Sequence, residues 1–192
     1  MDNARAAIIE GLNVFRALES WGAALYAAWA SREPDARLRA GHLITAEREA
    51  NHARLLAERL RALGAEPGPA CVDEILAAQL AELAPIGGFV AQLDAFKACT
   101  ERDAPRMTGC QRALERGFAA AKDSDPTTHR LLAQLSSEEK ASAAWYRHTY
   151  SELTGRRPMS LALPVLDPDQ VVRRAETVVE AAGQSATCSP PG

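Results

Sequence analysis

The sequence has few aromatic and few β-branched aliphatic residues. Of its 192 residues, 10 are Phe, Trp or Tyr and 13 are Val or Ile, whereas 39 are Ala and 21 are Leu. Ala and Leu favour helices, and the scarce residues are those that favour strands. This balance excludes an ordinary β-sandwich or parallel-sheet fold, and the chain is predicted to be all-helical.

Closely spaced cysteines are also missing. The four cysteines, at positions 71, 99, 110 and 188, include no Cys-x-x-Cys pair, which excludes zinc ribbons and rubredoxin-type iron sites. A disulfide framework is not expected at this density. Because the amino-terminal segment has no signal-peptide core, we expect a reducing, cytoplasmic location.

The sequence lacks both a long apolar run and a strong excess of positive charge. No apolar run is long enough for a transmembrane helix. The net charge is −3, and the 19 Arg and 3 Lys are interspersed with acidic residues. We therefore expect a soluble protein that binds neither membranes nor nucleic acid.

Proline and glycine divide the chain into helical stretches. We expect long helices at about residues 4–31, from the Pro34–Asp35 turn to 63, at 89–122 and at 126–153, and a short one at 73–84. The long helices form two hairpins, and the connection that contains the short helix crosses from one hairpin to the other. This order predicts a four-helix bundle with one long crossover.

Two domains are expected. Residues 1–155 form the bundle, and residues 156–192 form an extension with a short amphipathic helix and a disordered tail.

Acidic side chains interrupt the apolar stripes of three long helices. Glu19 lies in the first stripe, Glu49 and His52 lie in the second at i, i+3 spacing, and Glu139 lies in the last. Glu19 lies 15 residues before Pro34 and Glu49 lies 15 after it, so antiparallel helices bring the two together. A carboxylate in a helical core is costly unless it is paired or binds a metal. The joint pattern therefore predicts a metal site.

These residues carry a resemblance to a known superfamily. Glu19-Ser-Trp-Gly-Ala-Ala-Leu-Tyr26 followed by Glu49-Ala-Asn-His52 resembles the first half of ferritin-like proteins, which include ferritins, rubrerythrins and di-iron hydroxylases. Residues 99–104 resemble their third helix, and residues 131–140 resemble the approach to their fourth-helix motif. The likeness covers about residues 5–153.

The resemblance implies two irons that are bridged by glutamates and react with O2 or peroxide. Glu19 would be a terminal ligand, Glu49 a bridging ligand and His52 the nitrogen ligand, with Glu139 from the last long helix and Glu101 from the third. Carboxylate oxygens and imidazole suit iron, and also other divalent metals such as manganese.

Two tyrosines lie seven residues from these glutamates. Tyr26 follows Glu19 and Tyr146 follows Glu139 at this spacing. Both are candidate catalytic residues that would donate hydrogen bonds near the ligands. The alternative is that each is a core residue with its hydroxyl group bonded elsewhere.

The sequence departs from the family pattern at two places. The second Glu-x-x-His motif ends in Ser142, so the second metal would lose its imidazole, as it does in ferritins. On the third long helix, the apolar stripe carries Asp103, and Glu101 lies about 200° away around the helix. Pro105 predicts a kink or bulge nearby, and Glu101 is ranked slightly above Asp103 as the ligand.

Three functional hypotheses follow. The first is a di-iron-type oxidoreductase that oxidises iron or peroxide or hydroxylates a small molecule, with a separate protein as electron donor. The second is a degenerate bundle without a dinuclear site, a binding or structural module in which Glu49, His52 and Glu139 pair with arginines such as Arg16 or Arg48. The third is a homo-oligomer in which the terminal helix docks on a neighbouring copy.

Overall fold

The computed structural model describes residues 3–156, and this part of the chain contains helices and no strands. The helices are α1 (Asn3–Arg32), α2 (Ala36–Ala62), α3 (Asp73–Leu83), α4 (Phe89–Ser124) and α5 (Pro126–Thr154). The all-α prediction is confirmed, and the predicted helix ends agree to within about two residues. The helix expected in the carboxy-terminal extension lies outside the described residues.

The helix ends follow from local side-chain chemistry. The Asp35 carboxylate accepts hydrogen bonds from the first free N–H groups of α2, and Asp125 does the same for α5. Pro126 starts α5, where its missing N–H costs nothing. Gly155 ends α5 with a φ of 66°, a left-handed conformation that glycine adopts without strain.

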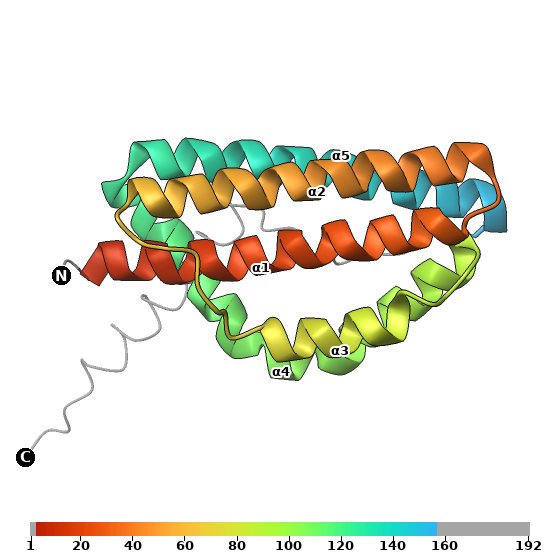
Figure 1. Cartoon of the computed structure of the whole chain (residues 1–192), viewed down its shortest axis with the longest axis horizontal. Helices are drawn as coiled ribbons and strands as arrows, with labels where there is room; N and C mark the ends of the chain where they lie inside the picture. Colours follow the sequence, from red (N-terminus) through yellow and green to blue (C-terminus); the bar gives the residue numbers. More distant parts are fainter. Residues whose placement is uncertain (1–2, 157–192) are drawn as a thin grey trace, which may run out of the picture.

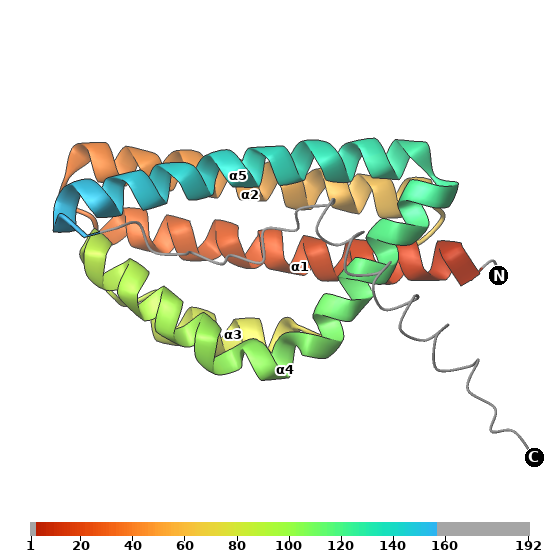
Figure 2. The same cartoon turned by 180° about the vertical axis from the view of Figure 1, so that it is seen from behind.

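The four long helices differ in how closely they pack. Figures 1 and 2 show α1, α2 and α5 running side by side, whereas α4 bows so that its middle lies farther from α1 than its ends do. The short helix α3 packs on both α1 and α4 along the bowed part. Pro105 lies in this part of α4, where it breaks a backbone hydrogen bond and favours bending. The bow turns the middle of α4 toward α3.

The core consists of two apolar clusters separated along the helix axes. One contains residues 8, 12, 14, 15 and 17 of α1, 56 and 60 of α2, and 132 and 135 of α5. The other contains residues 25, 26 and 29 of α1, 38 and 46 of α2, and 146 and 150 of α5. On all three helices the acidic interruptions of the stripes lie between the two clusters. The buried polar groups are therefore shielded from water at both ends by apolar side chains.

Two glycines let α1 and α4 touch at the end of the molecule near the amino terminus. A Cβ atom on Gly117 would lie 2.9 Å from the Gly11 Cα and 2.9 Å from the Ala7 carbonyl oxygen. Both neighbours are backbone atoms that cannot rotate away. Glycine at position 117 is therefore required for this contact.

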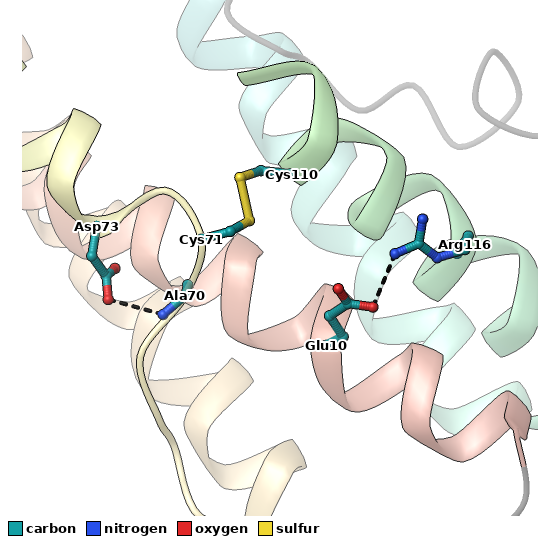
Figure 3. Close-up of a disulfide and its surroundings, with 6 residues drawn as sticks. All are labelled: Glu10, Ala70, Cys71, Asp73, Cys110 and Arg116. Carbon is teal, nitrogen blue, oxygen red and sulfur yellow. Dashed lines mark hydrogen bonds and ion pairs between the residues drawn. A yellow bond between two sulfur atoms is a disulfide. The ribbon is translucent and has the colours of Figure 1, made fainter. Parts of the chain in front are cut away.

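A disulfide joins the loop before α3 to α4. The structure bonds Cys71 to Cys110, with Cα atoms 5.9 Å apart, and Figure 3 shows the link next to α1, where Glu10 pairs with Arg116. The expectation of unpaired cysteines is wrong for this pair. The two residues are 39 positions apart, and only the crossover brings them together. Cys99 is free and buried.

The helices of residues 3–156 include none that is both long and apolar enough to cross a membrane.

The glycine contact predicts opposite effects for two alanine substitutions in α4. Gly117→Ala should lower the free energy of unfolding by about 1–3 kcal/mol, because the new methyl group overlaps α1 backbone. Gly109→Ala is the control, because its Cβ would meet nothing within 4 Å and alanine favours helix by about 0.5–1 kcal/mol. Urea denaturation measures both. Equal effects of the two substitutions would contradict the close contact.

Candidate metal centre

Three helices bring four predicted site residues together in the middle of the protein. Glu19 from α1, Glu49 and His52 from α2, and Glu139 from α5 each offer one ligand atom, and these atoms lie within 4.8 Å of one another. Glu19 is 3% exposed, Glu49 5% and His52 0%. The Glu49 side chain lies against Gly22 of α1. A Cβ atom added to Gly22 would lie 3.1 Å from the Glu49 Oε2 atom. We call these four residues the carboxylate–histidine cluster.

His52 is the centre of the cluster. Its Nδ1 lies 3.1 Å from Glu19 Oε2 and 3.3 Å from Glu139 Oε1, and its Nε2 lies 2.8 Å from Glu138 Oε2. When the imidazole ring is neutral, its single proton can lie on Nε2, which then donates a hydrogen bond to Glu138. The lone pair of Nδ1 then faces Glu19 and Glu139. Carboxylates fix metal-binding histidines in this way. Glu138 therefore selects the tautomer that can bind an ion inside the cluster.

Burial makes the cluster electrostatically costly without a cation. Burial raises the pKa of Glu49 well above its ordinary value, and the charges of Glu19 and Glu139 raise it further. The pKa of Glu19 is also raised by burial, against the hydrogen bond from His52. Although burial lowers the pKa of His52, its hydrogen bonds to Glu139, Glu19 and Glu138 raise it to about 10. Without an ion, a proton on His52 supplies the positive charge.

The donor set suits a metal ion that accepts hard oxygen ligands and one imidazole. Three carboxylates and one histidine are ligands for iron, manganese or zinc. The cluster can therefore hold a metal ion, with the proton on His52 Nδ1 as the species that the ion displaces.

The two candidate tyrosines lie beside the cluster and stack on one another. The ring centroids of Tyr26 and Tyr146 are 5.2 Å apart, and both side chains are buried. Burial raises the pKa of both phenols, so they are neutral. The Tyr146 hydroxyl is hydrogen-bonded to His42 Nδ1 at 2.9 Å. The alternative of a core residue with its hydroxyl bonded elsewhere therefore describes Tyr146.

The structure does not bring Glu101 to the cluster. Its carboxylate is 68% exposed and pairs with Lys97 on the outer face of α4. Asp103 is buried, but it accepts hydrogen bonds from Gln79 of α3 and from Arg102, which hold its pKa at about 2. The bow at Pro105 turns this part of α4 toward α3, so neither candidate carboxylate reaches the other three helices.

Arg48 contacts Ser142, the residue at which the resemblance implies a second histidine. Its Nη1 donates to Ser142 Oγ at 2.5 Å and to the Glu138 carbonyl oxygen at 3.0 Å. From the sequence, Arg48 is expected near these residues only if no metal is bound. The Arg48–Ser142 contact joins α2 to α5, and no local sequence pattern predicts it. Arg16, its companion in that hypothesis, instead donates to the Gly68 carbonyl oxygen.

Comparisons of the chain with protein-family models, with curated proteins and with solved structures find no match. The protein is therefore classified by its own fold and by the ligand atoms of the carboxylate–histidine cluster. It is an all-α protein with a buried carboxylate–histidine cluster that can hold a metal ion.

The raised pKa of His52 predicts a pH-dependent stability of the metal-free protein. The pKa is about 10 in the folded state and about 6.5 when unfolded, so this contribution is fully present below pH 6.5 and is lost as the pH rises through 10. The free energy of unfolding should fall between pH 7 and 10, by up to about 1.4 kcal/mol per pH unit.

Denaturation of the metal-free protein at several pH values measures this slope. His52→Gln should reduce it, because the titrating group is gone. His148→Gln is the control, since His148 is exposed on α5. Identical slopes for the wild type and the His52 variant would contradict the pairing.

Proposed function

We propose that this chain is a metal-dependent oxidoreductase of the ferritin-like type, whose metal is iron and whose oxidant is O2 or peroxide. The observation that carries the proposal is the convergence of Glu19, Glu49, His52 and Glu139 within 4.8 Å, in the interior and from three helices. Unpaired carboxylates are not retained in a core without compensation, and a metal cation would compensate all three.

The residues around the cluster would support the chemistry of a bound iron. Iron bound by carboxylates and imidazole would supply electron transfer with O2 or peroxide. The protein's own contributions are to orient His52 through Glu138 and to exclude water through the two apolar clusters. We propose iron as the resident metal, with manganese as the chemical alternative.

The proposed reaction needs partners that the chain does not supply. Cys-x-x-Cys rubredoxin motifs are missing from the sequence, so a separate protein or small molecule would deliver electrons. Oxidation of iron or peroxide requires no organic substrate, whereas hydroxylation would require a small molecule.

A specific observation favours a second candidate, a helical binding or structural module without metal. Protonated His52 donates to Glu19 and Glu138 and lies 3.3 Å from Glu139, so one imidazolium can compensate part of the acidic charge of the cluster without a metal. In this case, replacing a buried acidic residue by an apolar one should not destabilise the protein. The two candidates differ in whether the purified protein carries a metal.

The proposal predicts iron-dependent oxidation that requires Glu49. Anaerobically loaded protein should consume O2 or peroxide while the near-ultraviolet absorption of ferric carboxylate centres appears. Glu49→Ala should lower bound iron and the oxidation rate at least tenfold, because a buried ligand is removed. Glu47→Ala is the matched control, since Glu47 is exposed two residues earlier on α2.

Bound iron below half an equivalent, and unchanged by Glu49→Ala, would contradict the oxidoreductase and favour the module without metal. Thermal unfolding of both variants checks that the helices remain folded.

A further inference from the structure

We infer that the carboxylate–histidine cluster binds one metal ion rather than the two of the family pattern, and that the guanidinium group of Arg48 takes the place of the second. The inference rests on the proposed function only in requiring that a metal is bound.

The geometry of the donor atoms fits a single ion. The four atoms all lie within 4.8 Å of one another. Donors on opposite sides of one ion, at metal–ligand distances of about 2.0–2.3 Å, are separated by about 4.0–4.6 Å. A single ion can therefore contact one atom from each of the four residues.

A second ion lacks ligands on both helices that should supply them. On α4, Asp103 is engaged by Gln79 and Arg102, and Glu101 lies on the outer face. On α5, Ser142 stands one turn after Glu139 in place of an imidazole, and its hydroxyl oxygen accepts a hydrogen bond from Arg48. The carboxylate–histidine cluster thus offers one imidazole and three carboxylates, which is one imidazole and one carboxylate short of a dinuclear donor set.

Arg48 places a cationic group next to Ser142, where a second ion would need its imidazole. The same Nη1 donates to Ser142 Oγ and to the Glu138 carbonyl oxygen, so both contacts anchor the guanidinium to α5. Ser142 and Arg48 therefore form a matched pair: the small hydroxyl group leaves room for the guanidinium, and the guanidinium keeps out a second metal ion.

Metal titration of the full chain tests the inference. Anaerobic addition of Fe(II), with Mn(II) as a second probe, should saturate at one ion per chain by elemental analysis after desalting. A ratio of two would overturn the inference and leave the proposed oxidoreductase standing. A ratio near zero would overturn the proposed function as well.

A pair of double variants tests the part played by Arg48. Arg48→Leu with Ser142→His removes the guanidinium and restores an imidazole, so a second ion should bind and the ratio should rise above one. Arg54→Leu with Ser142→His is the control, because Arg54 is exposed on α2 and pairs with Glu58; its ratio should stay at one. Equal ratios for the two double variants would overturn the role of Arg48.

Discussion

Three carboxyl groups lie at one height in the helical core, with Glu19 and Glu49 buried and Glu139 partly buried beside them, and this is the constraint on which the rest of this structure depends. Each of these groups is costly alone, and their mutual repulsion adds to the cost. Three features of the surroundings offset this cost. His52 can hold a proton among them, Arg48 donates hydrogen bonds to the neighbouring Ser142 and Glu138 backbone, and the apolar clusters above and below stabilise the helices that carry them. Burial raises the pKa values of Glu19 and Glu49, and the metal ion that we propose would compensate their charge.

The parts that could be predicted from the sequence are those that depend on periodicity and local caps. Glu19, Glu49 and Glu139 stood out because each interrupts an otherwise apolar stripe, and a stripe on a straight helix faces the core along its whole length. The equal distances of Glu19 and Glu49 from the Pro34 turn predicted that they would meet, since antiparallel helices have a common rise per residue. Asp125 and Pro126 identified the start of α5 by the same local chemistry that stabilises it.

The parts that could not be predicted depend on contacts between distant segments. The bow of α4 and its contact with α3 decide where Asp103 points, and no local pattern shows that Gln79 is its partner. The Cys71–Cys110 disulfide depends on where the crossover passes α4. Arg48 is adjacent to Glu49 in sequence, yet its importance comes from Ser142, which lies 94 residues away. From the same contact we infer one bound ion in place of the two irons that the resemblance implies.

The central claim is that these four residues hold a metal ion, and anomalous X-ray diffraction tests it most directly. Crystals grown with Fe(II) or Mn(II) and measured at the absorption edge of the metal should show one peak per chain. The account predicts that this peak lies within about 2.3 Å of an oxygen of Glu19, Glu49 and Glu139 and of Nδ1 of His52. If crystals grown with excess metal show no anomalous peak among these side chains, or show the peak elsewhere, the account is contradicted.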